Sequence, residues 1–314
     1  MKRRTFVTKT LQTGIALSAL PLISNCNKET TGILPKRRLG RTGEKLSIIG
    51  FGGIIVSNID QEEANNLVSK AIDQGCNYFD VAPTYGNAEG MLGPAFEPYR
   101  KDCFLACKTQ KRDAAGAEEE LHSSLQKLRT DYFDLYQLHA ISSVDDVEQA
   151  FGPAGAMETF IKAKKEGVVR YLGFSAHSQE AALLAMEKFD FDTILIPVNF
   201  VCWFQGNFGP AALAKAKEKG MGILALKALA FTRIPQGEPR VYEKAWYVPI
   251  EDETVGDLSL RFTYSRGATA AIPPGEYKFW DRAVNIAMKS TEISEGEISQ
   301  LQKTAEGVEP LFRA

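Results

Sequence analysis

Short apolar runs rich in β-branched and aromatic residues recur along the chain, and each is followed by a longer stretch whose apolar positions have helical spacing. Most runs begin roughly 25 to 35 residues after the previous one, with a longer interval before the last. This alternation indicates a βα unit repeated eight times. The predicted strands are Ser47–Phe51, Asn77–Asp80, Phe104–Cys107, Phe133–His139, Arg170–Phe174, Thr193–Val198, Gly222–Leu226 and Ala268–Ile272.

Capping residues predict where the helices between these strands begin and end. Asp60 stands before Gln61-Glu62-Glu63, which is a capping-box arrangement, and an apolar helical face follows it. Gly167 and Gly220 stand where helices are expected to stop. Further helices are predicted over Asp113–Leu128, Met157–Lys165 and Ala181–Phe189.

The chain length fits a closed barrel better than an open sheet. A (β/α)8 barrel takes about 250 residues plus insertions, and this chain has 314. No G-x-G-x-x-G sequence follows the first predicted strand, which disfavours a doubly wound dinucleotide-binding sheet. We therefore predict an α/β fold of one domain, a (β/α)8 TIM barrel over residues 36–314.

Composition and charge exclude several classes of protein. A hydrophobic fraction of 44% and a charged fraction of 24% exclude disorder, collagen and coiled coil. The net charge is −2 and no basic stripe is present, so we expect no nucleic-acid partner. No apolar run approaches the roughly 18 residues that a membrane span needs.

The first 26 residues differ from the rest. A basic start, Arg3-Arg4-Thr5-Phe6-Val7-Thr8-Lys9, precedes an uncharged apolar run from Leu11 to Ser24. Together they resemble the n-region and h-region of a twin-arginine export signal. An amphipathic N-terminal helix or a chance basic start is the alternative. We predict that residues 1–26 are an export signal and that the protein resides in the periplasm or cell envelope.

A second resemblance lies at the end of this segment. Leu22-Ile23-Ser24-Asn25-Cys26 is similar to a bacterial lipoprotein box, although Asn25 stands where a smaller residue is usual. Cys26 would then carry a lipid, and residues 27–35 would form a short tether. This lipid anchor is the one membrane contact that we expect.

The other cysteines and the histidines show no metal-binding pattern. The four cysteines after Cys26 lack C-x-x-C spacing, and the three histidines are scattered, so no metal site is predicted. Cys107 ends a predicted strand and Cys103 directly precedes it, so extended chain places their Cα atoms ~13 Å apart. That distance is too long for a disulfide bond.

Four polar residues mark the ends of three neighbouring predicted strands. Asp80 closes the second strand, Lys108 ends the third, His139 ends the fourth, and Tyr85 lies in the loop after Asp80. Barrel enzymes place their chemistry at these carboxyl ends, so the four side chains can converge on one mouth. Taken singly, Asp80 could cap a helix, Lys108 could extend to solvent, and His139 could be a hydrogen-bonded strand-end residue.

Together, these side chains can protonate an oxygen atom. A phenol has an ordinary pKa near 10, and the ammonium of Lys108 would lower the pKa of Tyr85 toward the working range. Asp80 would keep Lys108 charged, and His139 could hydrogen-bond a carbonyl oxygen or relay the proton. None of the four offers a hydride, so the chemistry needs a nicotinamide cofactor.

With these residues, the chain resembles the aldo/keto reductases from residue 36 to about residue 290. Three more stretches match that family: Arg38-Leu39-Gly40-Arg41-Thr42-Gly43, Tyr85-Gly86-Asn87-Ala88-Glu89 and Asp131-Tyr132-Phe133-Asp134-Leu135. The resemblance implies reversible reduction of a small-molecule aldehyde or ketone by NAD(P)H, sugar-derived carbonyls and alcohols included. It implies that Tyr85 is the general acid, that Lys108 and Asp80 adjust the pKa of Tyr85, and that His139 orients the carbonyl.

The cofactor side of the site matches the family less completely. Ala176 and Leu195 replace an asparagine and a glutamine that usually bind the nicotinamide amide, and Pro274 replaces a lysine common in NADPH-preferring members. NADP is the predicted cofactor on family habit, with NAD as the alternative. The implied cofactor contacts are Ser175, Asn199, Leu226, Lys227 (toward the pyrophosphate) and Asn285 (toward the adenine).

One long insert follows the seventh predicted strand. Ala228–Glu251 exceeds an ordinary βα loop and contains four aromatic residues, so it is either a self-packed surface excursion or a lid over the cofactor. Trp203 and Phe204, after the sixth strand, are candidates for the substrate pocket.

Two functions fit these residues. The first is an exported oxidoreductase that interconverts carbonyls and alcohols. The second is a nicotinamide-binding barrel that serves as a redox-sensing or partner subunit with little turnover. The complete set of four strand-end residues favours the enzyme, and the missing amide contacts keep the second function open.

Overall fold

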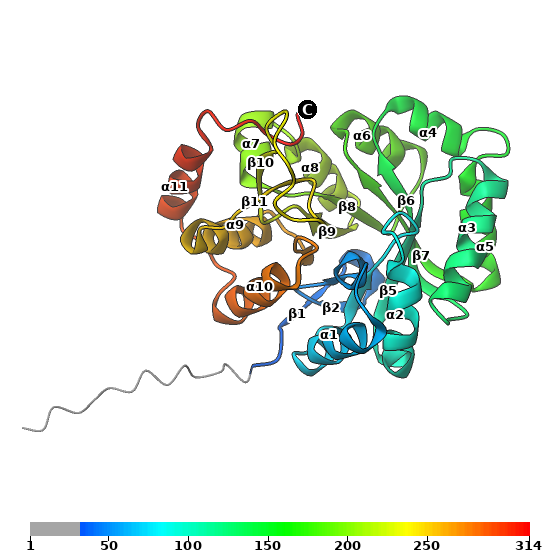
Figure 1. Ribbon diagram of the computed structural model, residues 1–314. Helices are drawn as coiled ribbons and strands as arrows, with labels where there is room; N and C mark the ends of the chain where they lie inside the picture. Colours follow the sequence, from blue (N-terminus) through cyan, green and yellow to red (C-terminus); the bar gives the residue numbers. More distant parts are fainter. Residues whose placement is uncertain (1–31) are drawn as a thin grey trace, which may run out of the picture. The chain divides into compact units, whose positions relative to one another are not determined.

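The computed structural model describes residues 32–314, so the predicted export signal and Cys26 lie outside the described residues. Eight parallel strands form one sheet that curls into a barrel with helices outside it (Figure 1). The predicted (β/α)8 fold is confirmed. In sheet order the strands are β3 (Phe51–Gly52), β4 (Tyr78–Asp80), β5 (Phe104–Thr109), β6 (Phe133–Ile141), β7 (Val169–Ala176), β8 (Thr193–Pro197), β9 (Gly222–Leu226) and β12 (Ala270–Ile272).

The barrel closes between the first and last strands. The N–H of Ala271 donates to the carbonyl of Ile48 at 2.8 Å, and the N–H of Gly50 donates to the carbonyl of Ala271 at 3.0 Å. The predicted first strand, Ser47–Phe51, is therefore not one uniform strand. Its start belongs to a separate hairpin, and its middle supplies the closing contacts.

Helices follow the strands as the capping residues predicted. The side chain of Asp60 accepts from the N–H of Glu63 at the start of α1, Asp113 caps α3 in the same way, and Gly167 ends α5 with a φ of 78°. The helices are α1 (Gln61–Asp73), α2 (Ala88–Phe96), α3 (Ala114–Lys127), α4 (Val144–Phe151), α5 (Ala156–Glu166), α6 (Gln179–Lys188), α7 (Phe200–Gly206), α8 (Pro210–Glu218), α9 (Glu253–Ser265), α10 (Tyr277–Lys289) and α11 (Glu295–Ala305).

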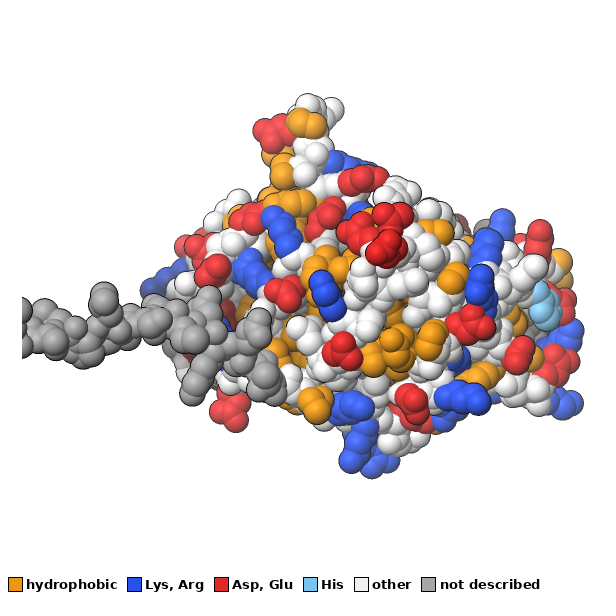
Figure 2. All heavy atoms as spheres, turned by 60° about the horizontal axis from the view of Figure 1, so that its bottom comes forward, with side chains coloured by type: hydrophobic (Ala, Val, Ile, Leu, Met, Phe, Trp, Pro, Cys, Tyr) orange, Lys and Arg blue, Asp and Glu red, His pale blue; other side chains and the backbone are white. Residues whose placement is uncertain are grey.

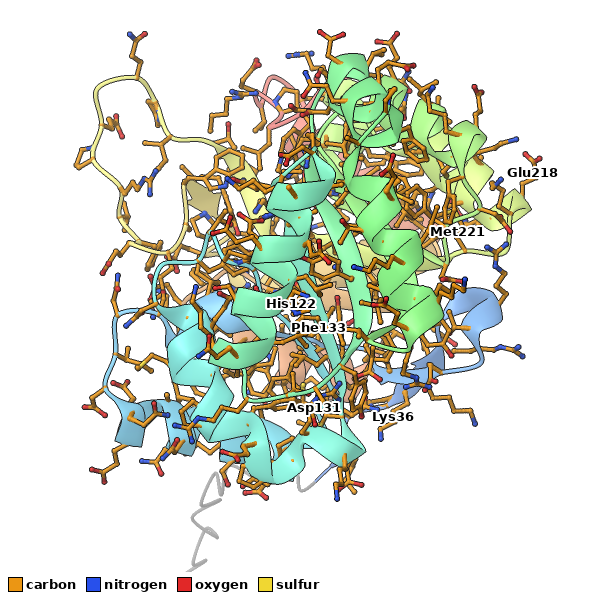
Figure 3. The ribbon with its side chains drawn as sticks, turned by 90° about the vertical axis from the view of Figure 1, so that its right-hand side faces the viewer. Lys36, His122, Asp131, Phe133, Glu218 and Met221 are labelled. Carbon is orange, nitrogen blue, oxygen red and sulfur yellow. The ribbon has the colours of Figure 1, made fainter. Side chains whose placement is uncertain are left out.

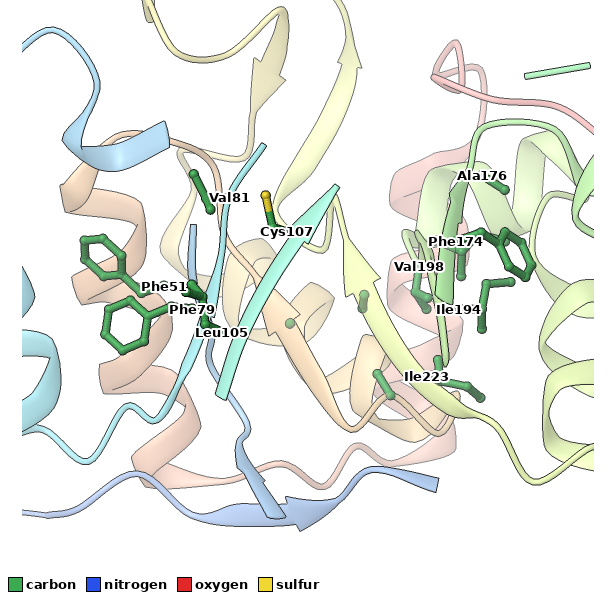
Figure 4. Packing of buried hydrophobic residues seen from close by; sticks show 14 of the residues in the cluster. Phe51, Phe79, Val81, Leu105, Cys107, Phe174, Ala176, Ile194, Val198 and Ile223 are labelled. Atoms are coloured by element: carbon green, nitrogen blue, oxygen red, sulfur yellow. The ribbon is translucent and has the colours of Figure 1, made fainter. Parts of the chain in front are cut away.

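Apolar side chains fill two layers, because successive residues of a strand point to opposite faces. The outer layer lies between strands and helices, where Phe51, Phe79 and Leu105 project from neighbouring strands (Figure 4). The inner layer fills the barrel itself and includes Leu135 and Leu195. The barrel is therefore a packed core, and polar side chains have room only at its ends.

A short antiparallel hairpin covers the amino end of the barrel. It consists of β1 (Lys36–Arg38) and β2 (Lys45–Ser47). Leu39 and Leu46 from this hairpin are buried in the inner core. The carboxyl ends of the strands form the opposite, open end, which we call the mouth.

The insert after β9 is partly a hairpin and partly a projecting loop. Its two ends pair as β10 (Ala230–Arg233) and β11 (Tyr247–Pro249). Between them the chain extends away from the barrel, as the yellow loop in Figure 3 shows, and Val241 there is 81% exposed.

The surface in Figure 2 carries basic and acidic side chains interspersed with one another. Within residues 32–314, no helix combines the length and the apolar character needed to cross a bilayer. The four cysteines of this part are buried and form no disulfide bond with one another.

Candidate active site

The four predicted strand-end residues meet at the mouth of the barrel. A cavity of about 310 Å³ opens there, and Asp80, Tyr85 and His139 line it. Lys108 lies directly behind them on β5 and is buried. Strands β4, β5 and β6 are neighbours in the sheet, which explains why side chains distant in sequence converge.

A buried ion pair forms the floor of this cavity. The ammonium of Lys108 contacts the carboxylate of Asp80, and both side chains are 1% exposed. Lys108 Nζ also donates to the carbonyl oxygen of Val81 at 3.2 Å. Burial opposes the charge on Lys108, but the carboxylate beside it outweighs burial and raises the pKa of Lys108 above its ordinary value.

Two further residues hold Asp80, and the sequence analysis missed both. The hydroxyl of Tyr78 and the amide Nε2 of Gln137 donate to Asp80 Oδ2 at 3.4 and 3.3 Å. Gln137 could have been found from strand alternation, since it lies two residues before His139 and therefore faces the same way. Tyr78 stands in the same relation to Asp80.

Tyr85 lies half-buried above the ion pair. Lys108 Nζ is 5.1 Å from the centre of its ring, and the ring of His139 lies 5.9 Å away, edge to face. Burial raises the pKa of Tyr85 above its ordinary value, although Lys108 opposes this shift. The expectation that Lys108 brings this pKa down is wrong in its net direction, because burial outweighs the cation. Tyr85 is therefore protonated at neutral pH, as an acid must be.

His139 is uncharged at neutral pH. Burial, followed by the charge of Lys108 and other cations at the mouth, lowers the pKa of His139 to about 2. Its Nδ1 lies 3.5 Å from the hydroxyl oxygen of Thr84. A neutral imidazole can donate one hydrogen bond and accept another, so His139 suits carbonyl orientation better than proton transfer.

Lys227, at the end of β9, brings a second cation to the cavity. Its Nζ lies 4.6 Å from the ring centre of Tyr247 and 5.2 Å from that of Trp246. No carboxylate forms an ion pair with it within residues 32–314. Burial, and then the charge of Lys108, lowers the pKa of Lys227 to about 8.

Asn199 supports Lys227. Its Oδ1 accepts from the N–H of Cys202 and caps α7, while its Nδ2 donates to the carbonyls of Lys227 and Ala230 at 3.0 and 2.5 Å. Lys227 adopts a φ of 63°, in the left-handed region that is unfavourable for residues other than glycine. The hydrogen bonds of Asn199 therefore stabilise this conformation. The structure thus places Asn199 beneath the turn that presents Lys227.

The other predicted cofactor residues differ in their position relative to the cavity. Leu226 lines the cavity, whereas Ser175 is buried on β7 and does not line it. The Oγ of Ser175 accepts from the N–H of Ala140 at 2.7 Å. Asn285 lies on the exposed face of α10, where it contacts Asp281 at 3.3 Å, and it does not line the cavity.

Trp203 and Phe204 do not line the cavity, contrary to the expectation for a substrate pocket. Both belong to α7 and pack their rings on Phe262 of α9 at 5.8 and 5.5 Å. Once Asn199 starts the helix, its apolar face is directed to α9. The aromatic wall comes instead from Trp246 and Tyr247 of the insert.

The insert borders the mouth with one part and projects from the barrel with another. Lys244, Trp246 and Tyr247 of the insert line the cavity, and Lys244 Nζ donates to the carbonyl of Ile55 at 2.7 Å across the mouth. Asn58 donates to the carboxylate of Glu243 at 2.8 Å on the same side. The remaining loop projects into solvent.

Two groups at the mouth fit a nicotinamide dinucleotide. Lys227 lacks an anionic partner among the described residues, and a pyrophosphate would supply one. The hydroxyl proton of Ser175 has no acceptor within residues 32–314, and a carboxamide oxygen would accept it. Ala176 and Leu195 are buried and apolar, so they add no hydrogen bond.

Comparison with known proteins agrees with this geometry. The model of the Aldo/keto reductase family matches residues 48–244, which is well over half of the chain. The chain belongs to the aldo/keto reductase family.

Relatives of this aldo/keto reductase are oxidoreductases. The uncharacterized oxidoreductase YqkF of Bacillus subtilis (strain 168) is 26% identical over 298 residues, covering 85% of this chain and 95% of YqkF. L-Galactose dehydrogenase of Arabidopsis thaliana is 27% identical over 228 residues, covering 67% and 70%. The aldo-keto reductase AKR11C1 from Bacillus halodurans, in its holo form, shares the fold with a TM-score of 0.69 and 22% identity over 88% and 98% of the chains.

The aldo/keto reductase is therefore an NAD(P)-dependent oxidoreductase. The alternative of a redox-sensing or partner subunit with little turnover is not favoured, because the family and its relatives are oxidoreductases.

Proposed function

We propose that this aldo/keto reductase reduces the carbonyl group of a small, polar, sugar-like molecule, with Tyr85 as the acid. One observation carries the proposal. A protonated phenol stands over a buried Lys108–Asp80 pair, with a neutral imidazole at the same mouth. This arrangement is suited to delivering a proton to an oxygen atom that gains negative charge.

The residues of the mouth divide the proton chemistry among them. A carbonyl oxygen that becomes an alkoxide takes the phenolic proton of Tyr85, and the charge left on Tyr85 is stabilised by the ammonium of Lys108. Asp80 keeps Lys108 charged and in place. The raised pKa of Tyr85 keeps it protonated until the oxygen takes its proton.

His139 would orient the carbonyl through a hydrogen bond to its oxygen. The cofactor, when bound, supplies or accepts the hydride at the carbon atom. Ser175, Leu226 and Lys227 would hold its nicotinamide and pyrophosphate groups, and Asn199 would support Lys227.

The walls of the cavity favour a hydroxylated substrate. Thr84, Gln110 and His177 present polar side chains to it, and Trp246 presents an aromatic ring. Burial, and then Lys227, lowers the pKa of His177 to about 4, so its imidazole is a neutral hydrogen-bonding group. A sugar or a sugar-derived alcohol has hydroxyl groups that the polar side chains of the cavity can hydrogen-bond, and an apolar face that can pack on the aromatic ring.

Replacing Tyr85 by phenylalanine tests the proposed acid. Tyr85→Phe should lower kcat for carbonyl reduction by about 10²-fold or more, because it removes the proton donor. Binding of NADPH, measured by fluorescence titration, should stay within twofold of the wild-type value. Tyr99→Phe, outside the cavity, is the matched control and should leave kcat unchanged. Wild-type turnover in Tyr85→Phe would exclude this mechanism.

NADP is the proposed cofactor, and NAD is the alternative. Two basic residues of α10, Arg282 and Lys278, could reach a 2′-phosphate, but both are engaged in hydrogen bonds within the protein. Arg282 donates to the carbonyls of Ile250, Glu251 and Asp252, and Lys278 donates to Tyr242 at 2.5 Å. Parallel titrations with NADP and NAD distinguish the two.

Binding of either dinucleotide should weaken as the pH rises through about 8. Lys227 is charged below its pKa of about 8 and neutral above it, so a pyrophosphate loses its partner at higher pH. We expect the dissociation constant to rise up to tenfold per pH unit in this range. The control variant Lys227→Arg keeps its charge and should show no such step. Equal affinity on both sides of pH 8 in the wild type would count against this role.

We also propose export, lipid anchoring at Cys26 and retention of the cofactor through turnover. The twin-arginine pattern supports export of a folded protein, and the contacts of Lys244 and Glu243 across the mouth support slow release of a bound cofactor. We expect the wild type in the cell-envelope fraction with nicotinamide bound, as seen by native mass spectrometry. The double variant Arg3→Lys, Arg4→Lys should remain in the cytoplasm. A cytoplasmic wild type would refute export, and an empty exported protein would refute retention.

A further inference from the structure

Strand β6 carries one extra residue immediately after His139. The pairing of β6 with β7 shifts register between Leu138 and Ile141, so His139 and Ala140 stand opposite the single residue Ser175. Two residues opposite one define a β-bulge, a feature that re-aims side chains next to active sites.

The bulge changes the side of the strand to which the residues after His139 point. In a regular strand Ile141 would point to the same side as His139, because side chains alternate with a period of two. Ile141 is instead buried in the outer core, between strands and helices. Ala140 accounts for the change of side, with a φ of 54° in the left-handed region that alanine rarely adopts.

Side chains hold both polar groups of the peptide that joins His139 to Ala140. Arg112 Nη2 donates to the carbonyl oxygen of His139 at 2.7 Å. The N–H of Ala140 donates to Ser175 Oγ, also at 2.7 Å. The peptide plane is therefore fixed from two sides, and with it the direction in which the imidazole leaves the backbone.

Arg112 is itself firmly placed. Its Nη1 donates to the carbonyl of Gln110 at 3.1 Å, and its Nε pairs with Asp146 at 3.1 Å. Asp146 belongs to the capping box at the start of α4, which fixes the carboxylate. The side chain of Arg112 is only 12% exposed, so the guanidinium links the ends of β5 and β6 to α4.

We propose that Arg112 is a positioning residue for carbonyl reduction, acting through the peptide after His139. It holds the carbonyl of His139, while Ser175 holds the N–H of the same peptide, and the imidazole is thereby directed into the cavity. The functional consequence rests on the proposed role of His139. Ser175 would then serve twice, since its oxygen holds this peptide and its proton remains for the cofactor.

Histidine resonances test the positioning without any activity measurement. The chain has three histidines, so a full-length protein labelled with ¹⁵N-histidine gives a simple spectrum. Arg112→Lys keeps the charge but cannot bond three acceptors with a planar fork. It should shift or broaden the imidazole signals of His139 and leave those of His122, on the outer helix α3 (Figure 3), unchanged.

Arg261→Lys is the matched control. Arg261 is also 12% exposed, and its guanidinium bonds Asp257 of α9, Glu297 of α11 and the carbonyl of Glu292, which lies between α10 and α11. Its replacement should leave the His139 signals unchanged. Ser175→Ala, measured without cofactor, removes the other hold on the peptide and should also perturb His139, which covers the case in which Arg112→Lys does not fold.

Kinetics test the consequence for turnover. Arg112→Lys should lower kcat tenfold or more while the dissociation constant of NADP stays within twofold. In a His139→Gln background the same substitution should lower kcat by less than twofold, because the ring that it positions is absent. Equal losses in both backgrounds would show that Arg112 is merely structural.

The outcomes separate this proposal from the proposed function. Unchanged His139 signals in both Arg112→Lys and Ser175→Ala would overturn the positioning. Wild-type turnover in His139→Gln would instead disprove the role of His139, and the spectra would still show whether Arg112 and Ser175 hold the peptide.

Discussion

The buried pair of Lys108 and Asp80 is the interaction on which the rest of the mouth depends. Removing two charges from water costs several kcal/mol for each ion, and their attraction offsets this cost only when other polar groups complete the site. Tyr78 and Gln137 donate to the carboxylate, and the carbonyl of Val81 accepts from the ammonium. Such partners are available together only where strand ends converge.

The packed barrel below this pair confines the chemistry to one end. Leu135, Leu195 and Leu224 fill the interior, and the hairpin of β1 and β2 covers the opposite end. Tyr85, His139 and Lys227 therefore lie above the pair, at or after the carboxyl ends of β4, β6 and β9. The insert then adds Trp246 and Tyr247 as a wall that a short loop could not supply.

The sequence predicted the features that depend on local or periodic patterns. The strands, the helix cap at Asp60 and the strand-end residues follow from such patterns. The structure brings the strand-end residues together at the mouth. Features that depend on tertiary packing could not be predicted. The pKa of Tyr85 depends on burial by other elements, and Trp203 packs on a helix that is distant in sequence. Arg112 acts through a β-bulge that no pattern of residues in the sequence indicates.

The most direct test of the central claim combines stability and turnover in Lys108→Met, Asp80→Asn and the double variant. Lys108→Met should lower the free energy of unfolding by about 3–5 kcal/mol, because it leaves a buried carboxylate without its partner. The double variant should recover most of that loss, and none of the three should reduce carbonyls at the wild-type rate. Unchanged stability in Lys108→Met, or wild-type turnover in the double variant, would contradict the account.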